Sequence, residues 1–261
     1  MTILNVTKEA GVAHLHMNAP ERLNALSDAM LFELKTTLDN IAEDSDVRAV
    51  ILSGAGKAFC AGHDLKEMQA GRQSEDGGAA YFADLFSRCA TVMQRIQTIP
   101  QPVIAQVHGI ATAAGCQLVA TCDMAVAAEG TRFGVNGVNI GLFCSTPMVA
   151  LTRNISRKAA FEMLTTGRFI ETDEAMRLGL INKSVPAGDL QHETDALAQL
   201  VASKLASAVK VGKQAFYAQA AMTTADAYDF AGGVMVQNML DSDTNEGINA
   251  FLEKRKPDWN A

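Results

Sequence analysis

The sequence predicts an α/β fold: a coiled repeat of strands and helices, followed by a helical C-terminal portion. One observation behind this is a buried-type strand, a small-residue loop and a helix, an order that occurs twice in the first half. The second is that the signals are helical from about residue 157, with no proline between Pro186 and Pro257. With 261 residues, 48% of them hydrophobic, the chain can bury a substantial core.

The first strand–loop–helix unit is introduced by a strand and a helix. Residues 11–18 alternate apolar and polar as a half-buried strand does. Residues 27–44 form an amphipathic helix with Ser27 as its N-cap; its inward side chains are Met30, Leu31, Leu34, Leu38 and Ile41. A buried strand at 47–54 and a loop follow, and Asp64 and Glu67 have the spacing of a helix-capping pair.

The second unit repeats this order. Residues 79–98 are helical, 102–109 form a strand, 110–115 a loop and 116–122 a buried helix. Between the units, residues 69–78 are polar and glycine-rich, as in a surface loop. Short strands at "MAVAAEG" and "RFGV" come next. The helices beyond them are "RKAAFEMLTTG", "TDEAMRLGL", 190–206, 210–221, 224–240 and 246–255.

Composition argues against several classes of partner. The net charge of −7 disfavours nucleic acid and anionic membranes, and no apolar run approaches the roughly 20 residues of a membrane span. Lys8 and Glu9 interrupt the place of an export signal, so we expect a cytoplasmic protein. The five cysteines lack C-x-x-C spacing, which indicates reduced thiols, and we expect no metal site.

The stretch "GIATAAGCQLVATCD" (109–123) indicates a site. Residues 111–115 carry almost no side chain, which lets another group approach the bare N–H groups at a helix start. Gln117, a non-ionisable amide, falls near the first turn of that helix. The question is what these donors and the amide bind.

Four segments resemble the enoyl-CoA hydratase/isomerase (crotonase) superfamily over essentially the whole chain. They are "ERLNALS", "KAFCAGHDLKEM", "HGIATAAGCQLVATCDMAVAAEGTRFG" and "GINAFLEKRKPDW". "GLFCSTP" (141–147) is most similar to the branch of enoyl-CoA hydratase domain-containing proteins.

The resemblance implies a right-handed spiral of strand–strand–helix turns with a helical C-terminal trimerisation region. Residues 1–200 would form the spiral core with the acyl-CoA pocket, and 201–261 the oligomerisation region. It implies a homotrimer or a hexamer, an acyl-CoA substrate, and no cofactor other than the coenzyme A carried by that substrate.

In the family, two backbone N–H groups hold the thioester carbonyl; here they map onto His63 and Ala114. Fixed donors stabilise the charge that develops on that oxygen. The chain departs from the hydratase pattern at the two catalytic glutamates, which map onto Gln117 and Gly137. An amide orients a water but accepts no proton, so hydration should be poor. A positive φ is one reason for a glycine at 137.

Other site residues follow from the resemblance or from their chemistry. His63 is a candidate base, although we favour a role for its backbone alone. Ser145 matches the position of an acid in isomerase relatives, and Cys144 is interpreted as an inert buried thiol. Asp64 is interpreted mainly as a helix cap. The residues expected to bind coenzyme A are Arg22, Ala61, Asp64, Lys66, Phe251 and Lys254.

The reaction stays open among several alternatives. The protein is nominally an enoyl-CoA hydratase. An isomerase or a thioester hydrolase that uses Ser145 or His63 is the alternative within enzymes. A non-catalytic acyl-CoA-binding or regulatory protein is the alternative outside them. A serine peptidase ranks last, because no Ser/His/Asp arrangement can be assigned.

Overall fold

The computed structural model describes residues 2–259. The chain divides into two compact units, Met1–Val201 and Ala202–Ala261, which are described separately.

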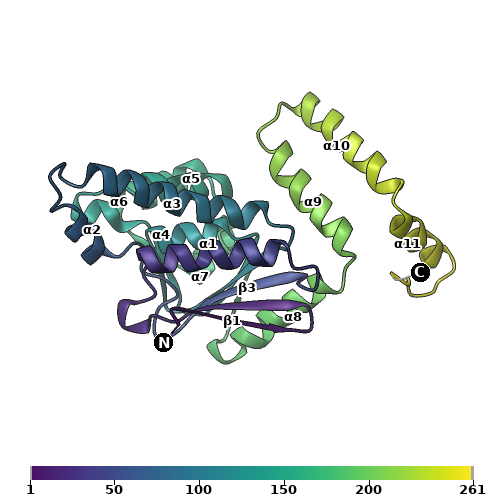
Figure 1. The fold of residues 1–261 in the computed structure, drawn as a ribbon, viewed down its shortest axis with the longest axis horizontal. Helices are drawn as coiled ribbons and strands as arrows, with labels where there is room; N and C mark the ends of the chain where they lie inside the picture. The colour runs from purple at the N-terminus through teal and green to yellow at the C-terminus, as the bar shows by residue number, and fades with distance from the viewer. Residues whose placement is uncertain (1, 260–261) are drawn as a thin grey trace. The chain divides into compact units, whose positions relative to one another are not determined.

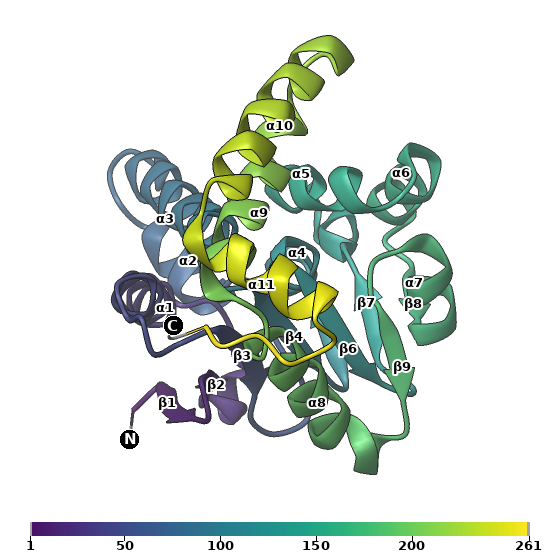
Figure 2. The ribbon, with the colours of Figure 1, turned by 90° about the vertical axis from the view of Figure 1, so that its right-hand side faces the viewer.

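The first unit is built on a six-stranded sheet in the order β1-β2-β3-β4-β6-β9. β1 (Leu4–Glu9) is antiparallel to β2, and the other neighbours are parallel. The remaining strands are β2 (Val12–Met17), β3 (Ala49–Gly54), β4 (Val103–Val107), β6 (Met124–Ala128) and β9 (Lys183–Val185). Figures 1 and 2 show α1, α3 and α4 on one side of this sheet and α8 on the other.

A smaller sheet has the order β5-β7-β8, formed by β5 (Ile110–Thr112), β7 (Arg132–Gly134) and β8 (Phe169–Glu171). The chain therefore gives β4 to the large sheet and β5 to the small one before α4, and it repeats this with β6 and β7 before the next helices. These are the predicted strand–strand–helix turns, and the predicted crotonase-like spiral is confirmed.

The helices of the first unit cover both faces of the large sheet. Ser27 accepts a hydrogen bond from Met30 N at the start of α1, and the five predicted inward residues are buried. On β6, Ala125 and Ala127 face the main core, while Val126 and Ala128 pack with Leu190 of α8. The helices are α1 (Asp28–Ala42), α2 (Leu65–Gly71), α3 (Ala79–Thr98), α4 (Ala114–Thr121), α5 (Ser145–Asn154), α6 (Arg157–Thr166), α7 (Thr172–Leu178) and α8 (Leu190–Ala202). Short 3₁₀ turns are η1 (Pro20–Arg22), η2 (Asn136–Ile140) and η3 (Ala187–Asp189).

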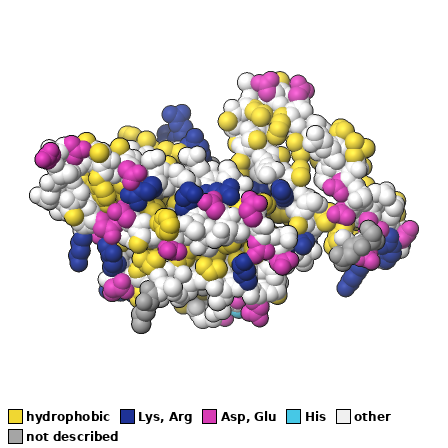
Figure 3. Space-filling view, in the orientation of Figure 1, with side chains coloured by type: hydrophobic (Ala, Val, Ile, Leu, Met, Phe, Trp, Pro, Cys, Tyr) yellow, Lys and Arg dark blue, Asp and Glu magenta, His cyan; other side chains and the backbone are white. Residues whose placement is uncertain are grey.

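The second unit consists of α9 (Ala206–Gln219), α10 (Thr224–Met239) and α11 (Ser242–Leu252). Thr223 caps α10 and Asp241 caps α11 through their side chains. Large apolar side chains stay exposed on these helices, and Figure 3 shows hydrophobic atoms gathered over α9 and α10. The most exposed are Leu240, Phe251, Tyr228 and Leu252.

Within the described residues, no helix is both long and apolar enough to cross a membrane. In the same residues, no group of three or more His, Cys, Asp or Glu side chains is arranged to hold a metal ion.

Candidate active site

One wall of the site is the turn at residues 19–26, which the Asn24 side chain fixes. Leu23 and Asn24 both have positive φ, near 53° and 51°. The buried Asn24 amide accepts from Ala19 N and donates to the carbonyls of Ala55 and Ala58. Because the Asn24 side chain bonds Ala19 of the turn and also the carbonyls of Ala55 and Ala58, it holds the turn against the loop that leads to His63.

The loop from Cys60 to His63 lies along the strand that leads into α4. Thr112 N donates to Cys60 O at 3.0 Å. A Cβ built on Gly115 would lie 2.1 Å from Cys60 O, and one built on Gly62 would lie 3.3 Å from Ala114 N. Gly62 also has a φ of +94°. Glycines at 62 and 115 therefore allow these two backbones to approach, which brings His63 beside the start of α4.

The N-terminus of α4 is uncapped. Ala113 is the N-cap residue, no side chain caps the helix, and its backbone is strained, with φ 50° and ψ −119°. Ala114 is the first helical residue, so its N–H has no intrahelical acceptor. Ala113 N donates instead to Gly134 O at 2.9 Å. A strained non-glycine residue at this point is typical of functional sites.

The His63 ring is largely buried. It lies edge to face against Phe86, with ring centroids 5.7 Å apart, and Nδ1 is 3.5 Å from Leu26 O. Burial lowers the pKa of His63, which favours the neutral form of the ring. We assign the proton to Nδ1 from the Leu26 contact; Nε2 is buried and has no hydrogen-bond partner among the described residues. The ring thus packs against Phe86 with its Nε2 shielded, although the residue as a whole is only part-buried.

Gln117 is 5% exposed, and its Oε1 is buried without a hydrogen-bond partner among the described residues. It lies in the first turn of α4, whose eight residues are all buried. A buried amide oxygen without a hydrogen-bond partner lowers stability. Such a group is typical of a site that binds a ligand or a water.

Gly137, in η2, does not have the positive φ that the sequence suggested. The reason for glycine is steric. A Cβ built there would lie 2.3 Å from Leu142 O and 2.8 Å from Cys144 Sγ. Burial raises the pKa of Cys144, which argues against a thiolate nucleophile.

Ser145 begins α5 with an exposed side chain. Its Oγ donates to Phe143 O at 3.4 Å, within the same turn. The structure shows no acid or base beside this hydroxyl among the described residues.

A cavity of about 280 Å³ brings together four residues that the sequence associates with coenzyme A. Together with His63, it is lined by Arg22, Ala61, Asp64 and Lys66. Phe251 and Lys254 lie in the second unit, where Phe251 is exposed and Lys254 has a φ of 55°.

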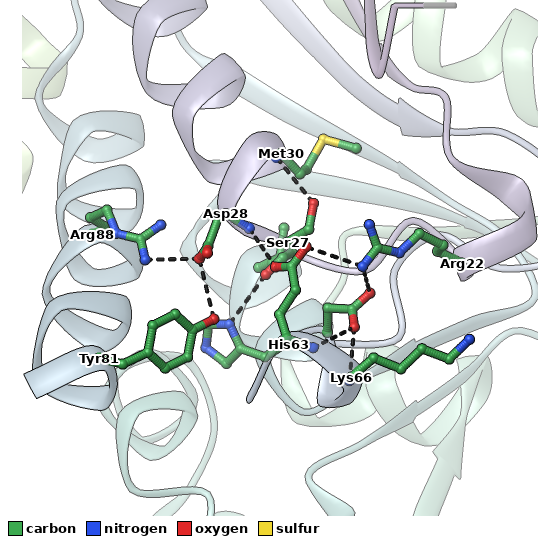
Figure 4. Close-up of polar contacts among 11 residues, drawn as sticks. Arg22, Ser27, Asp28, Met30, His63, Lys66, Tyr81 and Arg88 are labelled. Carbon is green, nitrogen blue, oxygen red and sulfur yellow. Dashed lines mark hydrogen bonds and ion pairs between the residues drawn. The ribbon is translucent and has the colours of Figure 1, made fainter. Parts of the chain in front are cut away.

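The charges around this cavity are mostly paired (Figure 4). Asp64 accepts from the N–H groups of Lys66 and Glu67 at the start of α2, and Arg22 bonds both Asp64 and Glu67. Burial alone would raise the pKa of Asp64, but those N–H groups and Arg22 outweigh it and lower the pKa. The Lys66 ammonium forms no ion pair with any described residue.

The hydrogen bonds that link these charged groups to neighbouring helices could not be predicted from the sequence. Glu67 does not complete the expected reciprocal cap: its Oε2 accepts from Asp28 N at 2.8 Å, so α2 is tied to the start of α1. Asp28 in turn binds Tyr81 and Arg88 of α3 (Figure 4). The spacing of Asp64 and Glu67 indicated the cap, but nothing local indicated its distant partners.

Curated relatives match the chain over nearly its full length. The human enoyl-CoA hydratase domain-containing protein 3, mitochondrial, is 45% identical over 249 residues, which cover 95% of this chain and 80% of that protein. The protein of the same name from Xenopus laevis is 44% identical over 259 residues, which cover 99% and 86%.

These names correct the expected cytoplasmic location, because the relatives are named as mitochondrial proteins. The expectation was wrong in its physical basis. It depended on the absence of an apolar export signal, whereas mitochondrial targeting segments are amphipathic and arginine-rich, so that absence does not bear on them.

Solved structures agree in fold. An enoyl-CoA hydratase from Mycobacterium smegmatis is 52% identical with a TM-score of 0.94, and the match covers 99% of both chains. The crystal structure of human enoyl-coenzyme A hydratase domain-containing protein 3 is 44% identical with a TM-score of 0.94, covering 98% of this chain and 100% of that one. The family model described as enoyl-CoA hydratase/isomerase matches residues 7–261. The chain therefore belongs to the enoyl-CoA hydratase/isomerase family.

Proposed function

We propose that this protein binds an acyl-CoA thioester and polarises its carbonyl between the backbone N–H groups of His63 and Ala114. The observation that carries the proposal is the uncapped start of α4 packed against the 60–63 loop, with the Gly62 Cβ position 3.3 Å from Ala114 N. Donors held by the fold stabilise an enolate-like oxygen without reorganising, and the helix dipole adds to this effect.

The cavity beside His63 is proposed to receive the coenzyme A part of the ligand. Lys66 is the cation available for its phosphates, because the Arg22 guanidinium already binds Asp64 and Glu67. We propose that Phe251 and Lys254 act from the second unit of a neighbouring subunit. A homotrimer, or a dimer of trimers, is supported by the exposed apolar side chains of α10 and α11.

Proton transfer is the weak step in this proposal. In place of the two glutamates the chain has Gln117, which can orient a water, and Gly137, which carries no side chain. General acid–base groups contribute roughly 10²–10⁴ each in rate. Hydration of an enoyl-CoA should therefore be slow. Neighbouring atoms fill the space that a catalytic side chain at residue 137 would need. This favours a second candidate function, in which the protein binds an acyl-CoA at the same carbonyl site without catalysis.

The carbonyl site can be tested without turnover. Acetoacetyl-CoA absorbs in the near ultraviolet as its enolate, so binding between the two donors should raise that absorbance at fixed pH. Coenzyme A alone, which lacks the carbonyl, is the matched ligand. Ala114→Pro deletes one donor at a helix position that accepts proline and should abolish the increase; thioester turnover should fall about 10²-fold or more.

Ala113 has a ψ of −119°, which lies outside the backbone region preferred by a residue before proline, so a proline at 114 strains the chain. The melting temperatures of Ala114→Pro and wild type are therefore compared. Retained binding of coenzyme A with a lost enolate signal supports the proposal. An unchanged enolate signal in a folded Ala114→Pro protein, or no enolate signal in wild type, contradicts it.

A further inference from the structure

A second cavity, of about 390 Å³, lies between α2, α3, the end of η2 and the segment that follows it. Most of its lining is apolar, with Gln69 and Arg72 as the polar side chains. The side chains that form it include Leu65, Met68, Phe82, Phe86, Ile140 and Leu142. We call it the α2–α3 groove.

The α2–α3 groove adjoins the cavity beside His63. Leu65 lines both this groove and the cavity beside His63. Phe86, on the groove wall, packs its ring against the His63 ring. An acyl chain whose carbonyl lies at His63 therefore has an apolar path along α2.

The groove also contains one cation. Arg72 ends α2, and its guanidinium carbon lies 5.3 Å from the centroid of the Phe82 ring. Leu65 and Arg72 are separated by roughly 10 Å along the axis of α2. Arg72 is thus at the C-terminal end of α2, whereas Leu65, which also lines the cavity beside His63, is at its start.

Arg72 forms no ion pair with any described carboxylate, unlike the other arginines near these helices. Arg22 binds Asp64 and Glu67, Arg88 binds Asp28 and Asp84, and Arg95 binds Asp39.

The acidic residues next along the chain leave Arg72 unpaired. Asp76 accepts instead from the N–H groups of Gly78 and Ala80, and Glu75 forms no ion pair with Arg72 among the described residues.

We infer that the α2–α3 groove binds an acyl chain that ends in a carboxylate, so that the ligand class is an ω-carboxyacyl-CoA of medium length. This inference rests on the proposed function. Apolar walls suit the methylene groups, and a planar guanidinium suits a terminal carboxylate, which it binds through two parallel hydrogen bonds. A terminal methyl group would leave the Arg72 guanidinium without a counter-charge.

The test compares two matched medium-chain 2-enoyl-CoA thioesters of equal length, one ending in methyl and the other in carboxylate. Binding is measured by calorimetry on the full chain. Wild type should bind the carboxylate ligand about two- to fivefold more tightly, a size that suits an exposed charge-assisted pair. Arg72→Gln should remove this preference, with the larger loss of affinity falling on the carboxylate ligand. Arg72→Lys should keep part of the preference.

Arg157→Gln is the matched control, because it removes the same charge from an exposed position on α6 outside the groove; it should leave both affinities unchanged. High salt should shrink the preference, since exposed charges are screened. Equal affinities in wild type, or an equal loss for both ligands in Arg72→Gln, would overturn the inference. If neither thioester binds while the protein is folded, it is the proposed function that fails.

Discussion

The Cys144 Sγ atom lies against the place where a side chain of residue 137 would begin. It lies 2.8 Å from a Cβ built on Gly137, and the Leu142 carbonyl oxygen lies 2.3 Å from the same point. Leu142 N also donates to Gly137 O at 3.0 Å, which closes the segment on itself. Residue 137 is therefore a glycine because the turn behind it has filled the space.

Gly137→Ala should lower the free energy of unfolding by about 1–3 kcal/mol, because an added methyl group forces the turn to move. Urea denaturation measures this. Gly188→Ala is the control, since a Cβ there meets nothing within 4 Å, and it should be nearly neutral. Equal stability of Gly137→Ala and wild type would show that the turn yields freely. The predicted clash also means that Gly137→Glu, a larger change, should not restore a hydratase.

Gln117→Glu should increase the hydration of crotonyl-CoA by about 10²-fold, because it places a proton-accepting group on the amide's position without changing its size. The initial rate of loss of enoyl absorbance is the measurement. Gln117→Met, which is similar in size but apolar, should show no increase. If Gln117→Glu leaves the rate unchanged while the enolate signal persists, residue 117 does not face the reacting carbons.

His63 should make the protein less stable in mild acid. Its pKa is lowered in the folded state by burial, so the unfolded chain binds a proton more readily as pH falls through about 6.5. The free energy of unfolding should therefore decrease between about pH 7.5 and pH 5. His63→Gln should reduce this decrease. The pKa of His16 is also lowered, mainly by burial and further by His108, so His16 should still contribute to the loss of stability in the variant. An identical pH dependence in wild type and His63→Gln would contradict this account.

Leu240→Asp should disrupt self-association, because Leu240 is 82% exposed beside other apolar side chains at the end of α10. Sedimentation velocity should show a trimer or hexamer for wild type and smaller species for the variant. Phe32→Asp, an equally polar change at an exposed position on α1, should leave the assembly intact. A monomer in wild type at micromolar concentration would refute the proposed assembly.

Elements with strong local signals could be predicted from sequence. α1 has a capping serine and a full apolar stripe, and α3 coincides with the predicted 79–98. β1, β5, β8 and β9 were missed, and residues 110–112 were expected to be a loop; β5 and β8, like β9, are three residues long. Only the first residue of β1 is buried, so it has no alternation, and β9 is three residues long. α4 begins at Ala114 instead of residue 116, because its N-cap is an alanine with positive φ, which no propensity scale indicates.

Part of the candidate site could likewise be predicted, because some of its residues lie in local sequence motifs. Arg22, Ala61, Asp64 and Lys66 lie in two sequence motifs, and the structure brings them to one cavity through the Asn24 hydrogen bonds. The roles proposed for them stay predictions. The packing of Phe86 on His63 and the unpaired state of Arg72 depend on contacts between α2, α3 and distant loops, which no local pattern encodes.

The complete burial of α4 has a consequence for how the site moves. Its amides that are hydrogen-bonded within the helix are shielded from solvent, so they should exchange only when the whole first unit opens. Hydrogen exchange at Gln117 N, which donates to Ala113 O, therefore reports global opening. The wall formed by Ile140 and Leu142 is exposed, 65% and 44% respectively, and is free to adjust on faster timescales. The thioester end of the ligand would contact the rigid start of α4. Its acyl tail would contact exposed side chains that can adjust to chains of different shape.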